Sequence, residues 1–420
     1  MKKSLLFITI LTLAITGCNK SETTTPAPQG DNGTTIPLSE ALSNLDNLLS
    51  QLDIDTKASH SRTYSIQSVS DFGGQDICKT KATGIDIPDT LMYLVNFDDA
   101  EGFAVLAADR RLGESIYCIT ENGTISKSDF TEAFDYLQSD VSLTKSSSSD
   151  DYDGFTDLGK KFVPALMLSS MLKDLKYGTQ FVKDSLRTEE PEGVKGNILL
   201  KTKWGQNSPF NDLIPNKYPT GCVATACAQI MQCCHKPSYP VYNGVYCVWE
   251  LMNTVCNTSD PYGRNATGEA KKYVANFLYH IGGHDYCRIE YGANGSSGYA
   301  SGVVRTLKKY GYSNVKKHLG FGNKNQGRAS SMLRNKLPVY IDGVDWHHGK
   351  VGHAWVLDGE WNGYFHCNWG WNGEWDGYYA KHNYFPIDYR EHTDVKDPGT
   401  TNSLGWHCYD WGFSIITYSL

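Results

Sequence analysis

Cys222 stands near the start of an apolar segment that runs from Thr220 to Met231. Thr220 is a residue type that caps helices, so we expect a helix in which Cys222 lies near the second position. Free backbone N–H groups and the positive end of the helix dipole would favour a thiolate there. A sulfur on a rigid, buried helix could attack a carbonyl carbon, whereas the simpler interpretation is a small core residue without chemistry.

His353 could supply the general base that such a nucleophile needs. It opens a predicted strand over residues 353–358, which ends at an Asp-Gly turn signal, and a second predicted strand covers residues 364–369. With a hairpin loop over 359–363, simple antiparallel register sets His353 opposite Trp369. A one-residue bulge sets it opposite Asn368 instead.

Either register brings Asn368 and Trp369 to the same end of the hairpin as His353. We assign to Asn368 the hydrogen bond that orients the imidazole, and to Trp369 the shielding of that bond from water. Plain core packing is the alternative for the tryptophan, and both functions are compatible.

Five segments resemble the motifs of streptopain-like cysteine peptidases, and they follow the family order over roughly residues 200–418. The interval from Cys222 to His353 also agrees with the roughly 130–150 residues that separate the two in papain-like enzymes. The resemblance implies an α+β, papain-like fold, in which a helical layer carries the nucleophile and an antiparallel β-sheet layer carries the histidine. It also implies endopeptidase activity and synthesis as a zymogen. The segments are Thr220–Met231 (nucleophile), Gly352–Gly359 (histidine), Asn368–Gly373 (tryptophan-rich), Trp204–Asn211 (oxyanion-hole glutamine) and Tyr291–Tyr299 (substrate loop).

The same resemblance implies functions for further residues. Gln206 would stabilise the oxyanion through its side-chain amide, together with the backbone N–H of Cys222, and losing one such donor typically costs ~3 kcal/mol. Without the resemblance, Gln206 reads as a solvated turn residue. Gly352, Ser297 and Tyr299 would contact the substrate. Gly352 is a single glycine where the family pattern has a pair, so the details of substrate contact stay open.

The N-terminal end predicts export. Residues 1–17 form a charged start and an apolar run too short to span a membrane, as in a signal peptide. The residues before Cys18 resemble a bacterial lipobox, so we expect cleavage there and lipidation of the Cys18 thiol, which would anchor the protein to the bacterial cell membrane or outer membrane. An ordinary signal peptide with a coincidental cysteine is the alternative. Residues 18–34 are a polar tether.

Residues 35–144 are predicted to form a separate small α+β domain, which resembles the inhibitory propeptide of the same family. Such a domain would cover the cleft, and it would block Cys222 or displace His353. A substrate-targeting or adhesive module is the alternative. The expected elements are an amphipathic helix from Leu38 to Leu52 behind Pro37, and strands at 92–97, 102–108 and 115–119.

Residues 145–197 are interpreted as a linker and activation region, and residues 198–420 as the catalytic domain. The region starts with a low-complexity stretch, 145–151, contains another predicted helix marked by Phe162 to Leu175, and breaks at 188–193. We expect the activating cleavage in this region, because exposed polar segments are the easiest targets of proteases.

Composition narrows the class of partners. The net charge of −7 gives no reason to expect nucleic-acid binding. Neither Cys233-Cys234-His235 nor His347-His348 is matched by a second group of residues at the spacing of metal ligands, so we expect no metal site. Nothing in the sequence indicates an organic cofactor. Export would permit disulfides among the 12 cysteines, but their pairing cannot be deduced.

We therefore expect a secreted, lipid-anchored zymogen of a cysteine endopeptidase that acts on proteins or peptides. Its own propeptide would be its intramolecular inhibitor. Two alternatives remain: a cysteine amidase or acyltransferase acting on cell-wall peptides, and an inactive peptide-binding relative. The joint presence of Cys222, His353, Gln206 and the Asn368-Trp369 pair argues against the inactive relative.

Overall fold

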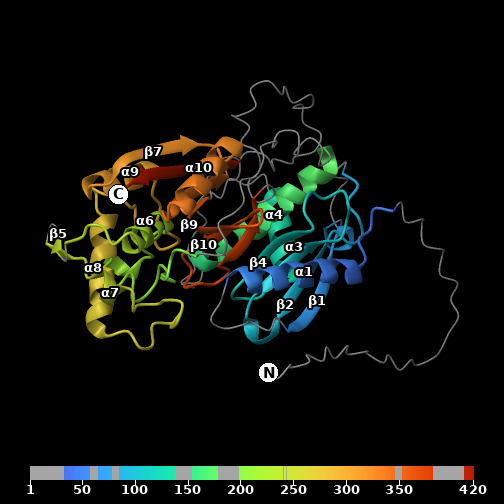
Figure 1. The fold of residues 1–420 in the computed structure, drawn as a ribbon, viewed down its shortest axis with the longest axis horizontal. Coiled ribbons are helices and arrows are strands. Elements are labelled where there is room, and N and C mark those ends of the chain that lie inside the picture. The colour runs from blue at the N-terminus through green and yellow to red at the C-terminus, as the bar shows by residue number, and fades with distance from the viewer. Residues whose placement is uncertain are drawn as a thin grey trace, which may run out of the picture. The chain divides into compact units, whose positions relative to one another are not determined.

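The computed structural model describes most of the chain outside the first 32 residues (Figure 1). The predicted signal peptide and nearly all of the predicted tether, including Cys18, lie outside the described residues. Among the described residues, none of the helices combines the length and the apolar character that a membrane crossing requires. The described ranges are 33–56, 65–77, 85–138, 154–177, 198–239, 241–242, 244–345, 352–381 and 411–420.

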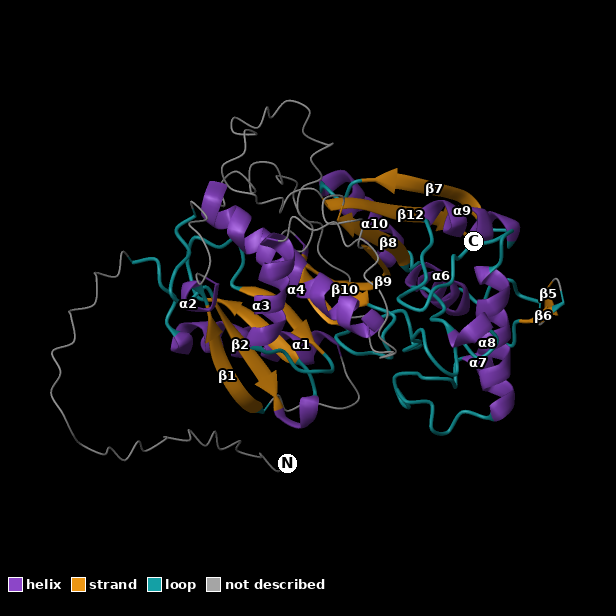
Figure 2. Ribbon diagram, turned by 180° about the vertical axis from the view of Figure 1, so that it is seen from behind, coloured by secondary structure: helices purple, strands orange, loops and turns teal. Residues whose placement is uncertain are grey.

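Residues 35–177, called the N-terminal domain below, include four strands in their described part, with helices beside them (Figure 2). The predicted helix behind Pro37 and the three predicted strands are confirmed, because apolar side chains at these positions are buried. Its elements are α1 (Leu38–Thr56), β1 (Ile66–Phe72), α2 (Gly74–Ile77), β2 (Met92–Phe97), η1 (Asp98–Ala100), β3 (Phe103–Ala107), β4 (Ile116–Thr120), α3 (Lys127–Gln138) and α4 (Gly154–Tyr177).

The C-terminal domain, residues 198–420, contains the segments that carry the predicted chemistry. Helix α6 begins at Cys222 and contacts β8 and β9 of the sheet as well as helices α8 and α9. Its elements are η2 (Pro215–Lys217), α6 (Cys222–Cys233), β5 (Val241–Tyr242), β6 (Val245–Tyr246), α7 (Trp249–Met252), α8 (Gly268–Gly282), α9 (Ala300–Lys309), β7 (Ser313–Leu319), α10 (Asn323–Arg334), β8 (Val339–Asp345), β9 (Gly352–Trp361), β10 (Tyr364–Asn368), β11 (Gly377–Ala380) and β12 (Trp411–Ser419).

One antiparallel sheet runs through both domains. Its strand order is β1-β2-β3-β4-β11-β10-β9-β8-β12-β7, so four N-terminal strands extend six C-terminal ones. The domains meet where β4 pairs with β11, with Thr120 opposite Gly377 and Cys118 opposite Tyr379. A substitution at Gly377 would clash with β4, because an added Cβ would lie 2.3 Å from the carbonyl oxygen of Ile119. The N-terminal domain is thus joined to the sheet that carries His353.

The β9–β10 hairpin differs from the predicted one. Its turn is the two-residue Asn362-Gly363, with φ of 43° and 82°, and both positive values are typical of the tight turns that match strand twist. Strand β9 continues past the expected end to Trp361, and the register shifts by a bulge before Cys367. Asn368 consequently lies opposite Val356, so both predicted registers at His353 were wrong.

Helix α4 lies in the region that sequence reasoning assigned to the linker, and the helix predicted there is confirmed. It packs on α3, where Lys161 forms an ion pair with Glu132 at 3.2 Å. Asp174 on the same helix accepts the backbone N–H of Gly113 at 2.9 Å. The helix also contacts β9 in the C-terminal domain (Figure 1). α4 therefore bridges the N-terminal domain and the strand of His353.

Candidate active site

The approach to α6 fixes the position of Cys222. Gly221, not Thr220, precedes the helix, and Cys222 is its first residue, so the predicted cap was wrong. Gly221 has a φ of 85°, where side chains are strained, and the backbone turns sharply into the helix there. Instead of capping, the Thr220 hydroxyl hydrogen-bonds with Thr225 at 2.8 Å. The thiol thus lies at the helix start, as expected, but the turn at Gly221 places it there and not a Thr220 cap.

The loop predicted to contact substrate packs on the same turn. Ser296 is buried and donates a 2.6 Å hydrogen bond to the carbonyl of Pro219, three residues before the nucleophile. A Cβ added at Gly298 would lie 3.3 Å from Cβ of Val223, so the loop backbone directly contacts α6. Ser297 and Tyr299 remain exposed, with Tyr299 at 74%. Both side chains are therefore accessible beside the start of α6.

His353 is held by the backbone of Trp369. Its Nε2–H donates to the Trp369 carbonyl oxygen at 2.8 Å. Because a carbonyl oxygen only accepts, Nε2 carries the hydrogen and Nδ1 is the unprotonated acceptor of a neutral ring. Aromatic rings surround the imidazole, with centroid distances of 4.7 Å to Trp371, 6.0 Å to Trp369 and 6.2 Å to Trp355. The structure therefore brings Trp369 to His353.

Asn368 makes other contacts. Its Oδ1 accepts from Nε2 of Gln229 at 2.8 Å, and its Nδ2 donates to the Thr202 carbonyl at 3.0 Å. Gln229 in turn accepts from the hydroxyl of Thr202 and the N–H of Trp204. The Asn368 amide is thus satisfied within a buried network, and in the described structure it forms no hydrogen bond with His353. The orienting acceptor is instead the carbonyl of Trp369.

Gln206 lies beside the nucleophile with an unused amide. The backbone carbonyl of Gln206 accepts the backbone N–H of Thr220 at 3.0 Å, so this residue is bound to the turn before α6. The side chain is only 5% exposed, yet neither Nε2 nor Oε1 has a hydrogen-bond partner in the described structure. Leaving buried polar groups unpaired costs about 1–3 kcal/mol, so such an amide calls for an explanation. An oxyanion that is present only during reaction would provide one.

Both candidate catalytic groups are neutral in this conformation. Among the described contacts, no hydrogen bond joins the Cys222 thiol to His353. Burial raises the pKa of Cys222 to about 11, although the N–H groups of Ala354 and Val223 lower it. Burial lowers the pKa of His353 to about 4, against the opposing effect of the Trp369 hydrogen bond. The expected thiolate is therefore absent here, because burial outweighs the helix N-terminus.

A ring from the N-terminal domain completes the burial of His353. Phe162 on α4 meets the imidazole at a centroid distance of 5.9 Å and Trp355 at 5.8 Å, edge-on in both cases. Phe162 is 2% exposed. α4 thus adds to the burial that lowers the pKa of the candidate base.

Comparisons with known proteins agree with this geometry. Residues 204–379 match the model of the Peptidase C10 family. Streptopain of Streptococcus pyogenes is 25% identical over 314 residues, which cover 69% of this chain and 73% of that protein. The protein is a streptopain-like cysteine peptidase. A thiol protease/hemagglutinin, PrtT of Porphyromonas gingivalis, is 31% identical over 195 residues, which cover 40% of this chain and 21% of that protein.

The fold of this cysteine peptidase is the papain-like α+β fold with a preceding propeptide-type domain, as expected from the sequence. The solved structure of prointerpain A from Prevotella intermedia matches it with a TM-score of 0.50 at 22% identity, over 80% of this chain and 96% of that one. The enzyme class, a cysteine endopeptidase, follows from the family and its relatives.

Sequence reasoning missed three residues that build the site of this peptidase. Ser296 carried a weak signal, since it lies within the predicted substrate loop. Gln229 also lay inside a quoted motif, where a glutamine on a buried helix face indicates a polar partner. Phe162 gave no signal, because its contact with His353 joins segments far apart in the sequence.

The cysteine peptidase shows no sign of metal ligation in the described part of the chain, where no cluster of three or more His, Cys, Asp or Glu side chains could hold an ion. His347 and His348 lie outside the described residues, as do Cys78 and Cys408. The nine described cysteines are all free thiols, namely Cys118, Cys222, Cys227, Cys233, Cys234, Cys247, Cys256, Cys287 and Cys367.

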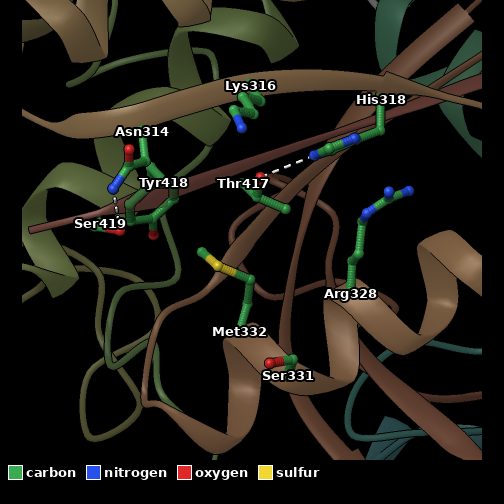
Figure 3. Close-up of a pocket in the computed structure, with 9 residues that line it drawn as sticks. All are labelled: Asn314, Lys316, His318, Arg328, Ser331, Met332, Thr417, Tyr418 and Ser419. Atoms are coloured by element: carbon green, nitrogen blue, oxygen red, sulfur yellow. Dashed lines mark hydrogen bonds between the residues drawn. The ribbon is translucent and has the colours of Figure 1, made fainter.

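A separate hollow of about 390 Å³ opens between β7, α10 and β12 (Figure 3). Lys316, His318 and Arg328 line it, and Nε2 of His318 lies 2.9 Å from the hydroxyl oxygen of Thr417. Burial, together with Arg328 and Lys316, lowers the pKa of His318. None of the predicted site residues lines this hollow, so it is distinct from the peptidase site.

Proposed function

We propose that Cys222 is the nucleophile of this cysteine endopeptidase and His353 its general base. The Cys222 sulfur would attack the carbonyl carbon of a peptide bond, while Nδ1 of His353 accepts the thiol proton and then passes it to the leaving amine. The thioester that forms would be hydrolysed by water activated by the same imidazole. The support is the packing of α6, which begins at Cys222, against β9, which carries His353. The hydrogen bond from Nε2–H to Trp369 also leaves Nδ1 as an acceptor.

Gln206 and the backbone N–H of Cys222 would form the oxyanion hole. The buried, unpartnered amide of Gln206 supports this assignment, because it is ready to donate without first breaking another hydrogen bond. The exposed loop with Ser297 and Tyr299, together with Gly352 at the start of β9, would contact the substrate chain.

The N-terminal domain is proposed to keep the enzyme latent. The observation that carries this proposal is the contact of Phe162 with His353. By excluding water, α4 favours the neutral imidazole, and a neutral imidazole beside a neutral thiol cannot supply the thiolate that attacks the substrate. Removal of α4 would let water stabilise the imidazolium and with it the thiolate.

Activation would require a cut after α4. The expected region, residues 145–197, contains this helix, whose residues from 162 to 174 are buried and so are poor protease targets. A cut before Gly154 would leave Phe162 attached to the catalytic domain. We therefore narrow the proposed cleavage to residues 178–197.

Export and lipid anchoring at Cys18 are proposed from the sequence alone. The anchor would hold the latent enzyme at a membrane surface, and cleavage after α4 would release the catalytic domain from it. Metabolic labelling with a fatty acid tests this part, with Cys18→Ala as the control. Label retained by Cys18→Ala would contradict the anchor.

Intact mass measured during incubation tests the peptidase and its latency together. The chain from residue 19 onward is prepared as wild type and as Cys222→Ala, under reducing conditions, and a thiol-directed epoxide is added afterwards. We expect only the wild type to shorten to a product that begins within residues 178–197, and that product to take up one probe. A chain that stays whole is then treated with an outside protease.

Two outcomes would overturn the proposal. An active product that still contains residues 154–177 would contradict latency through α4. A wild-type product with the expected N-terminus that neither labels at Cys222 nor cleaves a fluorogenic protein would contradict the assigned nucleophile. Cleavage of cell-wall peptides in place of proteins would favour the amidase alternative.

A further inference from the structure

Asp376 is connected to His353 through one residue. Its Oδ1 accepts the backbone N–H of Trp369 at 2.9 Å. The carbonyl oxygen of the same Trp369 accepts Nε2–H of His353 at 2.8 Å. Asp376 is fully buried and belongs to the turn that leads into β11. The Asp376 carboxylate therefore fixes the backbone of the residue that orients the imidazole.

Lys203 connects Asp376 to the N-terminal domain. Its Nζ donates to Oδ2 of Asp376 at 2.9 Å and to Oε2 of Glu121 at 3.2 Å, and its side chain is only 5% exposed. Glu121 immediately follows β4, and its backbone N–H donates to the carbonyl of Asp376 at 2.7 Å. Asp376 is thus bound twice across the junction of the two domains, through its carbonyl directly and through its carboxylate by way of Lys203.

A second cation joins the same network. His366 is fully buried, with Nδ1 2.6 Å from Oδ1 of Asp358. Its Nε2 lies 3.4 Å from Oε1 of Glu121, which is an ion-pair contact without hydrogen-bond geometry. Burial lowers the pKa of His366, but Asp358 and Glu121 outweigh this and raise it to about 10, so the ring is cationic at neutral pH. Both cations of the network therefore face the Glu121 carboxylate.

The buried cations and anions of this network are equal in number within the C-terminal domain alone. Within the C-terminal domain, Lys203 and His366 face Asp376 and Asp358, two cations against two anions. Glu121 adds a third anion that shares both cations. Removing the N-terminal domain would consequently leave Asp376 with its cation, and Trp369 with its backbone acceptor.

We propose that Asp376 is a positioning residue for the catalytic pair, acting through Trp369 on His353, and that Glu121 of the N-terminal domain engages the same Asp376–Lys203 pair. The proposal rests on the assignment of His353 as the general base. In the processed enzyme, Asp376 holds the Trp369 carbonyl where it receives Nε2–H and stabilises the imidazolium. In the zymogen, Glu121 binds the N-terminal domain to this same network.

The Asp376→Asn variant of the processed enzyme tests the positioning function. The asparagine keeps the shape but loses the attraction to Lys203, so the Trp369 carbonyl is held less firmly. We expect kcat to fall on the order of 10- to 100-fold, as small misplacements of catalytic groups do. The alkaline limb of the pH profile of Cys222 alkylation reports the deprotonation of the His353 imidazolium. We also expect this limb to move to lower pH, because the Trp369 carbonyl stabilises the imidazolium less. Glu250→Gln, which changes an exposed acid, is the matched control and should behave like wild type.

The double variant Asp376→Asn with Lys203→Met covers the case in which the single variant does not fold. It removes one cation and one anion together, and so leaves the net charge of the buried network unchanged. A folded Asp376→Asn or double variant with lower thermal stability but an unchanged alkaline limb and kcat would overturn the proposal, because that result describes a purely structural residue. A wild-type enzyme without Cys222-dependent activity would instead contradict the proposed function.

Glu121→Gln tests the connection to the N-terminal domain. Because Glu121 is removed by processing, the processed enzyme from this variant should have wild-type kcat and KM. In the intact Cys222-containing zymogen, we expect alkylation of Cys222 at pH 7 to be several-fold faster than in wild type. Glu40→Gln, which removes an exposed ion pair with Arg110 in the same domain, is the control. Equal labelling rates in Glu121→Gln and wild type would exclude the connection.

Discussion

The Phe162 ring meets the imidazole of His353 edge-on, with 5.9 Å between the ring centroids, although the two residues belong to different domains. Both rings are buried, and Phe162 also packs against Trp355. The contact adds to the buried environment in which the pKa of His353 falls to about 4. In the proposed function, latency would therefore come from desolvation of the base.

Replacing this ring should weaken latency. Phe162→Ala opens a path for water to His353, so the imidazolium and the thiolate become more accessible. We expect Cys222 in the intact zymogen to be alkylated by iodoacetamide at pH 7 about tenfold faster or more, since each unit by which the thiol pKa falls raises the thiolate fraction tenfold. Mass spectrometry of the labelled protein over time measures the rate.

Phe130→Ala is the control for this substitution. Phe130 on α3 is equally buried in the N-terminal domain, but its ring packs on Phe72 of β1, and no ring contact with His353 is among the described ones. Both substitutions should lower stability by about 3–5 kcal/mol, but only Phe162→Ala should accelerate labelling beyond the fraction of unfolded chain. Equal acceleration in both variants would mean that general loosening, and not exposure of His353, controls the thiol.

Gln206→Ala should remove activity without removing stability. The amide has no partner in the described structure, so its loss breaks no hydrogen bond of the resting protein. If it donates to the oxyanion, kcat of the processed enzyme should fall on the order of 10²- to 10³-fold. Steady-state kinetics on a fluorogenic protein, with thermal melting alongside, measures both quantities.

Gln326 offers a matched comparison. It is buried to a similar extent, but its Nε2 donates to the carbonyl of Phe321 at 3.0 Å. Gln326→Ala should therefore lower stability by about 1 kcal/mol and leave kcat near that of wild type. A Gln206→Ala variant that follows this second pattern would show that Gln206 is a structural residue.

The sequence was sufficient for the local features of the site. The apolar segment after Cys222 predicts a helix and its buried face, and the motif around His353 predicts a strand. These features depend on neighbouring residues, whose spacing and types are visible in the chain. The hairpin register was missed because Asn362-Gly363 was read as part of a longer loop, although this dipeptide is a strong signal for a two-residue turn.

Long-range contacts account for the remaining differences. Asn368 stands next to Trp369, yet its amide is bound by Gln229 and Thr202, which no spacing rule connects to it. Cys222 lies at a helix start, where its thiolate should be favoured, but burial raises its pKa. Both effects arise from packing between distant segments, which a single sequence does not display.

Acid should destabilise the zymogen through His353. The pKa of this residue is about 4 in the folded chain, against an ordinary value of 6.5. Between these pH values the unfolded chain binds the extra proton, so the stabilisation is present above pH 6.5 and is lost as the pH falls toward 4. The loss from this group reaches about 2 kcal/mol at pH 5. Urea unfolding of the Cys222→Ala zymogen at pH 7 and pH 5 measures it.

His353→Gln in the same Cys222→Ala background isolates this effect. Its stability should fall less between pH 7 and pH 5, while the contribution of carboxylates stays common to both proteins. His366 has the opposite sign, because its raised pKa gives stability that is present below pH 6.5 and lost as the pH rises toward 10. An identical acid dependence with and without His353 would show that the imidazole is not buried in the neutral form.

Asn368→Ala distinguishes a structural amide from an orienting one. The substitution leaves Gln229 Nε2 without its acceptor and the Thr202 carbonyl without its donor, so we expect a loss of stability of about 1–3 kcal/mol. Because the Trp369 carbonyl still holds His353, the alkaline limb of Cys222 alkylation in the processed enzyme should keep its wild-type pH. Gln229→Ala, which breaks the same network from the α6 side, should reproduce this result. If the alkaline limb of Cys222 alkylation moves to another pH in Asn368→Ala but not in Gln229→Ala, Asn368 is the residue that orients His353.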